Sequence, residues 1–133
     1  WDAACSGLDG AVFEDDLLDD SGCALQFRLR QGEYTVAPGV TAVATPGHTA
    51  GHMSLLIELP QGQPVLLAGD AADLQENIDH EIAPGTLWQG REAQAVDSIR
   101  KLKALARETG ARLWPNHDMA FFRSLPAFPN AVI

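Results

Sequence analysis

The sequence predicts an α/β fold in which a mixed sheet carries a helix on one face. Short apolar runs bounded by Gly and Pro indicate strands, residues 91–109 have the period of an amphipathic helix, and a further strand follows that helix. Because a strand, a helix and a strand in this order form a right-handed crossover, we expect the strands on either side of the helix to be parallel. The chain has 133 residues, enough for one domain.

Strands are predicted wherever apolar residues alternate with polar ones or form short continuous runs. The segments are residues 24–30, 34–36, 40–44, 53–59, 65–68 and 111–114. Pro38-Gly39 separates the second from the third as a tight turn would, and residues 60–64 break the fourth from the fifth, so that these two form a hairpin. Residues 53–59 are apolar on both alternations, which is typical of a strand covered on both faces.

One long helix is predicted between the last two strands. Apolar side chains recur on one face of residues 91–109, at Val96, Ile99, Leu102 and Leu105 or Ala106. Gly110 follows at the position where a left-handed residue closes a helix. Residues 71–90 indicate a long loop with one helical turn, and residues 116–133 a tail that wraps a surface.

The charge of the chain excludes two classes of partner. Nine basic against 18 acidic side chains give a formal net charge of −9, which repels nucleic-acid phosphates and anionic lipid headgroups. No apolar run approaches the roughly 20 residues that span a bilayer. We therefore expect no nucleic-acid and no membrane partner. Since acidic residues gather near the start of the chain, we interpret residues 1–23 as an acidic lid or linker and residues 24–133 as the domain.

Cysteine content and the start of the chain indicate the compartment and the extent of the protein. Cys5 and Cys23 share no metal-binding or redox spacing, and a disulfide-built fold needs more cysteines, so we expect a reducing compartment, the cytoplasm. The first methionine is Met53, and no signal-peptide pattern precedes it. We therefore expect these residues to be a piece of a longer protein.

Two histidines and an aspartate flank the strands that should end at one edge of the sheet. His48 lies just before the predicted hairpin and Asp70 just after it, and a hairpin returns to the edge from which it starts. The parallel crossover brings His117 to the same edge. Two imidazoles and a carboxylate suit zinc or a similar borderline metal, so we predict that these three residues bind metal. Three glycines in these loops should allow close backbone approach, and they are Gly47, Gly51 and Gly69.

Three motifs also resemble a known family. They are Pro-Gly-His-Thr-Ala-Gly-His at residues 46–52, Gly-Asp at residues 69–70 and Asn-His-Asp at residues 116–118. Together they resemble the second half of the metallo-β-lactamase superfamily. The segments at residues 34–40, 69–77 and 98–103 are most similar to the N-acyl-homoserine lactonase branch, and the resemblance covers residues 32–133.

The resemblance implies the C-terminal half of an αβ/βα sandwich that carries a metal centre. It implies that His48 binds one zinc ion, that His117 binds a second, and that Asp70 bridges both as the catalytic carboxylate. Members of this branch open the lactone ring of N-acyl-homoserine lactones, the signals of quorum sensing, with water activated between two zinc ions. The implied activity is therefore quorum quenching.

Four further residues are assigned around these ligands. Asp73 stands where many of these lactonases have a tyrosine that contacts the substrate, and Trp88 is our candidate for a contact with the acyl chain. His52 is expected to support its loop by hydrogen bonds rather than to bind metal. Asp118 is expected either to orient His117 from the second shell of the metal or to act as an ordinary capping carboxylate.

The His-x-His-x-Asp-His segment of the superfamily, which provides most of its metal ligands, does not occur in this sequence. In the family this segment lies upstream, so we expect the isolated chain to bind metal weakly and to be inactive unless the missing N-terminal half is supplied. Two alternatives to a lactonase stay open. One is a glyoxalase II-like hydrolase of thioesters or other esters, and the other is a non-catalytic half-domain that pairs with a complementary half or forms a homodimer.

Overall fold

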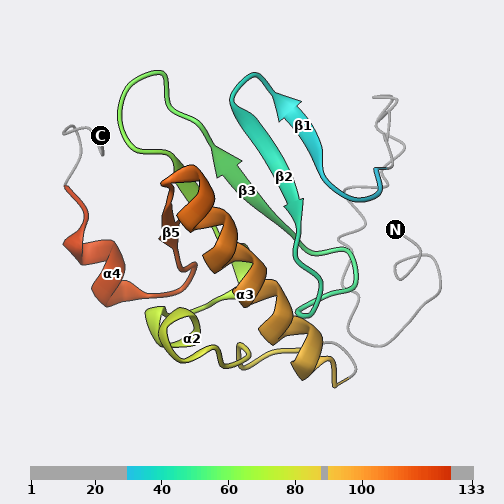
Figure 1. Ribbon diagram of the computed structural model, residues 1–133. Helices are drawn as coiled ribbons and strands as arrows, with labels where there is room; N and C mark the ends of the chain where they lie inside the picture. The colour runs from blue at the N-terminus through green and yellow to red at the C-terminus, as the bar shows by residue number, and fades with distance from the viewer. Residues whose placement is uncertain (1–29, 88–89, 127–133) are drawn as a thin grey trace, which may run out of the picture. The chain divides into compact units, whose positions relative to one another are not determined.

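The computed structural model describes residues 30–87 and 90–126, and the chain from Gly32 onward belongs to one compact unit. Within these ranges a sheet of five strands is accompanied by helices, as Figure 1 shows. The strands are β1 (Tyr34–Ala37), β2 (Val40–Ala44), β3 (Met53–Ile57), β4 (Val65–Leu67) and β5 (Arg112–Trp114). The helices are the short 3-10 helix η2 (Gly69–Ala71) and the α-helices α2 (Gln75–His80), α3 (Glu92–Thr109) and α4 (Met119–Ser124).

The sheet is mixed, and its strands lie in chain order. Strands β1 to β4 are antiparallel neighbours, whereas β5 pairs with β4 in parallel. The predicted turn at Pro38-Gly39, the hairpin of β3 and β4, and the parallel crossover through α3 are confirmed. The acidic segment 1–23, both cysteines and the predicted strand 24–30, except for Arg30, lie outside the described residues.

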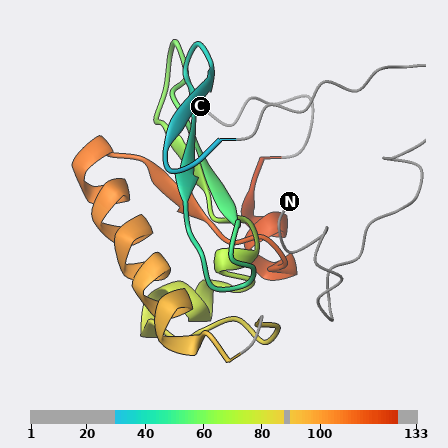
Figure 2. The same ribbon diagram turned by 90° about the vertical axis from the view of Figure 1, so that its right-hand side faces the viewer.

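Helix α3 covers one face of the sheet, and the turned view in Figure 2 shows it standing to one side of the strands. Leu66 of β4 meets Ile99 and Leu102 of α3 in one hydrophobic cluster, and all three side chains are fully buried. Leu56 of β3 belongs to the same cluster. Since burying one such side chain contributes about 1.5–3 kcal/mol, this face is the stabilising core of the unit.

The opposite face of the sheet is only partly buried. Along β3, Ser54 and Leu56 are buried, while Met53, Leu55 and Ile57 are half-buried. Strand β3, which was predicted to be covered on both faces, is therefore fully covered on only one face in the described part of the chain. Its second face is equally apolar but remains open to solvent in the described part of the chain.

The buried stripe of α3 differs slightly from the predicted one. Ala95 and Ser98 are fully buried, whereas Val96 is only partly buried. The small side chains are needed because the loop between β2 and β3 lies directly on the helix. The Ser98 hydroxyl donates to the Pro46 carbonyl at 2.6 Å, which fastens this loop to α3.

Gly47 allows the loop to approach the helix. A Cβ atom at residue 47 would lie 2.5 Å from the Cα of Ala95, and the φ of Gly47 is +146°, a backbone conformation that favours glycine. Gly51 of the same loop has no neighbouring atom within 4 Å of its would-be Cβ. Close backbone approach therefore requires glycine at residue 47, as predicted, but it does not require glycine at residue 51.

One short helix forms within the predicted loop and one within the predicted tail. Helix α2 lies where a loop with one helical turn was predicted; it has six residues and is followed by Glu81, whose φ is +54°. Glu81 accepts from Arg100 and Lys103 of α3 at 2.9 Å each, which ties the end of α2 to α3. Helix α4 forms within the predicted tail and begins after Asp118. None of the helices in the described ranges has the length and hydropathy required to cross a membrane.

Gly47→Ala should destabilise the protein, because the added methyl group collides with the backbone of α3 and the backbone is held at positive φ. We expect the free energy of unfolding to fall by about 1–3 kcal/mol in urea denaturation. Gly51→Ala is the matched control, since it adds the same methyl group to open space, and it should change stability by less than about 1 kcal/mol. Equal losses in the two variants would contradict this account of the loop.

Candidate metal centre

The structure brings His48, Asp70 and His117 together at one edge of the sheet. His48 lies in the loop before β3, Asp70 lies in η2 directly after β4, and His117 follows β5. His48 Nε2 is 3.6 Å from Asp70 Oδ2, and His117 Nε2 is 3.1 Å from Asp70 Oδ1. The Asp70 carboxylate therefore faces one imidazole with each of its two oxygens.

A backbone carbonyl orients the His48 ring. His48 Nδ1 lies 2.9 Å from the Thr86 carbonyl oxygen, so Nδ1 is the donor and Nε2 is left free to face Asp70. A ligating histidine is commonly held in this way through its other nitrogen. The sequence gives no signal for this contact, because any residue at position 86 offers the same carbonyl.

Asn116 is a residue of the site that the sequence analysis assigned no role. Its Nδ2 donates to Asp70 Oδ1 at 2.7 Å and lies 3.1 Å from His117 Nε2. Partial burial raises the pKa of Asp70, but the hydrogen bonds from Asn116 and His117 and the nearby His48 outweigh it, and the net effect lowers that pKa. Asp70 is therefore an ionised carboxylate at neutral pH. The sequence signal for a role of Asn116 is its position after the end of β5, directly before His117.

His52 holds the backbone of Asp70. The Asp70 N–H donates to His52 Nε2 at 3.0 Å, which requires the ring proton to be on Nδ1. Nδ1 in turn lies 2.9 Å from the Thr45 hydroxyl and 3.1 Å from the Thr45 carbonyl, and both can accept its proton. Burial lowers the pKa of His52, although the Thr45 carbonyl and the charge of Asp70 oppose it, so the neutral ring is favoured. His52 thus links the Asp70 backbone to Thr45 through its two ring nitrogens.

Two buried hydroxyls continue this network. Thr45 Oγ1 lies 2.8 Å from Ser54 Oγ, and the Ser54 hydroxyl donates to the Ala68 carbonyl at 2.8 Å. Because Ser54 uses its proton on Ala68, Thr45 donates to Ser54 and accepts from His52. Thr45 and Ser54 are 0% and 1% exposed, so each hydroxyl depends on these partners. The network joins the loop before β3 to the end of β4.

Gly69 is required next to this network. Its φ is +57°, and a Cβ atom there would lie 2.9 Å from His52 Nε2, the atom that accepts from Asp70. The glycine predicted at this position is therefore needed both for its backbone conformation and for the close approach of the His52 ring.

The carboxylate of Asp118 caps two segments. Its Oδ1 accepts from the Phe121 N–H at 2.8 Å, and its Oδ2 accepts from the Gln75 N–H at 3.0 Å. These backbone hydrogen bonds lower the pKa of Asp118. Of the two expectations for this residue, the hydrogen bonds favour capping, because both oxygens are used at the starts of α4 and α2.

Asp73 lies close to Asp70 and His117. Asp70, Asp73 and His117 can each offer one donor atom so that all three atoms lie within 4.8 Å of one another. Trp88, the other residue predicted to contact substrate, lies outside the described residues. His80 is exposed at the end of α2 and does not belong to any such group in the described ranges.

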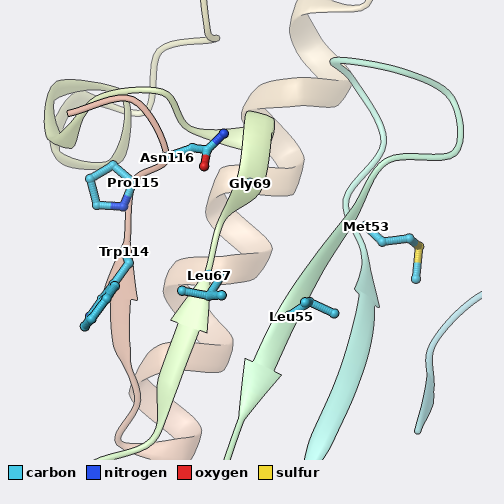
Figure 3. A pocket seen from close by; sticks show the side chains of 7 residues that line it. All are labelled: Met53, Leu55, Leu67, Gly69, Trp114, Pro115 and Asn116. Carbon is cyan, nitrogen blue, oxygen red and sulfur yellow. The ribbon is translucent and has the colours of Figure 1, made fainter. Parts of the chain in front are cut away.

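A hollow of about 210 Å³ adjoins the site on the open face of the sheet. Figure 3 shows the side chains that line it, on the side of the strands opposite α3. They are Met53, Leu55, Leu67, Gly69, Trp114, Pro115 and Asn116. The lining is mainly apolar, and its polar end at Asn116 is the end that contacts Asp70.

Thr45→Val should show that the buried network positions Asp70. The valine keeps the shape of threonine but removes one acceptor from His52 and one donor to Ser54, so we expect a loss of about 1–3 kcal/mol in the free energy of unfolding and a shifted amide NMR signal for Asp70. Thr41→Val in β2 is the control, because no side-chain hydrogen bond of Thr41 is present in the described part of the chain. An unchanged Asp70 amide in Thr45→Val would contradict the positioning role.

Comparison with known proteins identifies relatives of part of the chain, although no protein-family profile matches it. It is 36% identical over 109 residues to an N-acyl homoserine lactonase of a Bacillus species, and 34% identical over 109 residues to N-acyl homoserine lactonase AiiA of Bacillus thuringiensis subsp. kurstaki. Each alignment covers 81% of this chain and 42% of the relative. The chain thus spans less than half the length of the curated relatives it matches.

Solved structures give the same relationship. A structure of an N-acyl homoserine lactone hydrolase with the product N-hexanoyl-L-homoserine bound at the catalytic metal center matches with a TM-score of 0.71 at 34% identity, over 81% of this chain and 42% of that one. A probable metal-dependent hydrolase from Staphylococcus aureus has a TM-score of 0.51 at 19% identity over 68% of this chain, which shows the fold alone. The chain is therefore a homologue of part of the N-acyl homoserine lactonases, and its fold is that of the corresponding part of a metallo-β-lactamase-type domain.

Proposed function

We propose that His48, Asp70 and His117 form part of the metal centre of a lactonase that opens the ring of N-acyl homoserine lactones. The observation that carries this proposal is the Asp70 carboxylate, which faces a histidine nitrogen with each oxygen. The related hydrolase that holds N-hexanoyl-L-homoserine at its catalytic metal center supports the class of substrate. Quorum quenching is the activity that follows from this substrate.

The donor set fits metal ions of the size and preference of zinc. Two ligands that each lie about 2.0–2.1 Å from a tetrahedral zinc ion are about 3.3 Å apart. The 3.1 Å and 3.6 Å separations between Asp70 oxygens and histidine nitrogens bracket that value. A cation held between His117 Nε2 and Asp70 Oδ1 would replace the hydrogen bond that joins these two atoms. We therefore propose that His48 and Asp70 would help to hold one zinc ion and that His117 and Asp70 would help to hold a second.

Several residues of this chain would each have a separate role in the proposed centre. When bound, the zinc ions supply an activated water and polarise the lactone carbonyl. Asp70, kept ionised by its neighbours, holds the centre together, and His48 is fixed in orientation by the Thr86 carbonyl. Asn116 restrains the Asp70 oxygen that faces His117. This restraint keeps the donor atoms in place before substrate arrives.

A complementary half is the second part of the proposal. Three ligands are too few for two zinc ions, which prefer about four each. The chain spans 42% of its relatives, and the face of the sheet that carries Leu55, Leu67 and Trp114 is apolar and open in the described residues. We propose that residues 24–133 form one half of a sandwich, that residues 1–23 are a lid or linker, and that the other half supplies the remaining ligands. The site of action is proposed to be the cytoplasm.

Metal removal and two substitutions test the proposed activity in protein that contains both halves. Chelation should abolish hydrolysis of a long-chain N-acyl homoserine lactone, and added zinc should restore it. Asp70→Asn and His117→Ala should each lower kcat/KM by about 10³-fold, since a bound metal contributes several kcal/mol to the transition state. His80→Ala removes an exposed histidine and should leave the rate unchanged. Cleavage of S-lactoylglutathione but not of the lactone would favour the glyoxalase II-like alternative.

The composition of the isolated chain tests the need for a second half. We expect native mass spectrometry and elemental analysis to find no more than one tightly bound zinc ion per chain. We also expect the isolated chain to show no lactonase activity. A monomer that holds two tightly bound zinc ions would contradict the proposed incompleteness of the centre. A stable homodimer with restored activity would replace the complementary half with a second copy of the chain.

A further inference from the structure

We propose that Asp73 is a third protein ligand of the metal held by Asp70 and His117, so that this chain alone carries a three-ligand site for one divalent cation. The inference rests on the proposed function, because Asp70 and His117 belong to that centre. It replaces the substrate contact that the sequence predicted for Asp73. It assigns to the carboxylate a role that the tyrosine of the resembling lactonases would not have.

The donor atoms of the three residues converge on one small volume. One oxygen each from Asp70 and Asp73 and one nitrogen of His117 lie within 4.8 Å of one another. Ligands about 2.1 Å from a single cation lie between about 3 Å and about 4.2 Å apart, according to whether they are adjacent or opposite. Small side-chain rotations would therefore bring the three donors onto one ion. His48, on the other oxygen of Asp70, is not part of this group.

The backbone fixes Asp73 beside His117. The segments that follow β4 and β5 are joined by two backbone hydrogen bonds. The Asn116 N–H donates to the Ala72 carbonyl at 3.0 Å, and the His117 N–H donates to the Asp73 carbonyl at 2.8 Å. Asp73 and His117 are thus directly paired through their main chains. Their side chains start from adjacent points, so their approach does not depend on a freely moving loop.

The residues after Asp73 are also held. The Leu74 N–H donates to Asn77 Oδ1 at 2.8 Å, and Asn77 is only 6% exposed. The Gln75 N–H donates to Asp118 Oδ2 at 3.0 Å, which links the start of α2 to the segment that carries His117. Both contacts use backbone or neighbouring side chains and leave the Asp73 carboxylate available.

Charge supplies the driving force for binding. Asp70 and Asp73 are two carboxylates in close range, and no Lys or Arg side chain pairs with either in the described part of the chain. A divalent cation placed between the two carboxylates would be attracted by both. Two carboxylate oxygens and one imidazole suit divalent metals such as zinc, manganese, iron or cobalt.

Titration of the metal-free protein with Co²⁺, and with Zn²⁺ against a chromogenic chelator, tests this site. Asp73→Asn should lower the affinity for the first metal by about 100-fold or more, because even a residue that only supports a ligand costs about 10–100-fold when removed. It should also change the visible Co²⁺ spectrum, since the cobalt loses a charged ligand. Glu76→Gln on α2 removes the same charge from an exposed side chain and should alter neither value. Circular dichroism of the metal-free variants verifies folding.

The outcomes separate this proposal from the proposed function. If Asp70→Asn and His117→Ala lose the metal while Asp73→Asn keeps both its affinity and its cobalt spectrum, Asp73 is not a ligand and the lactonase proposal is untouched. A loss of affinity in Asp73→Asn that salt abolishes, with an unchanged spectrum, would reduce Asp73 to a nearby charge and overturn the proposal. Binding unaffected by all three substitutions would overturn both. Asp73→Ala, which offers no ligand atom, should repeat the loss seen with asparagine.

Discussion

The position of the Asp70 carboxylate depends on the hydrogen bond from the Asp70 N–H to His52 Nε2. That donor places the ring proton on Nδ1, which faces Thr45. At the other end of the network Ser54 donates to the Ala68 carbonyl, so Thr45 donates to Ser54. Since the hydroxyls are buried, no water competes for these bonds. A neutral, unreactive histidine is thereby used to hold the one carboxylate around which the other site residues are arranged.

The two faces of the sheet have different tasks, and the candidate centre lies at the edge where they meet. Small residues of α3, Ala95 and Ser98, admit the loop that carries His48, so the packing of the core determines where the His48 side chain lies. The other face presents Leu55, Leu67 and Trp114 beside a hollow that reaches Asn116. A partner that covered this apolar face would approach the same edge. Binding of such a partner would then bury the apolar face and bring the remaining ligands to the proposed centre at the same time.

Most of the fold was predictable because its signals are local, whereas the finer contacts of the site are not. Alternation and turn residues gave the hairpin of β3 and β4, periodicity and Gly110 gave α3, and the crossover rule brought His117 to the edge of Asp70. The Thr86 carbonyl carries no side-chain signal. Asn116 and the capping by Asp118 depend on which segments meet in space, and α4 is too short for a periodic pattern.

A second carboxylate beside Asp70 would change the chemistry of the centre as well as its affinity. An anionic ligand neutralises part of the charge of a cation, so it strengthens binding while it weakens the pull of that cation on a carbonyl oxygen. A neutral hydroxyl at residue 73 would leave the full charge available and could donate a hydrogen bond, which a carboxylate at neutral pH cannot do. As a ligand, the aspartate would therefore favour retention of metal at the His117 side over activation there. The stronger electrophile of the proposed centre would then be the metal on the other oxygen of Asp70, the one that His48 faces.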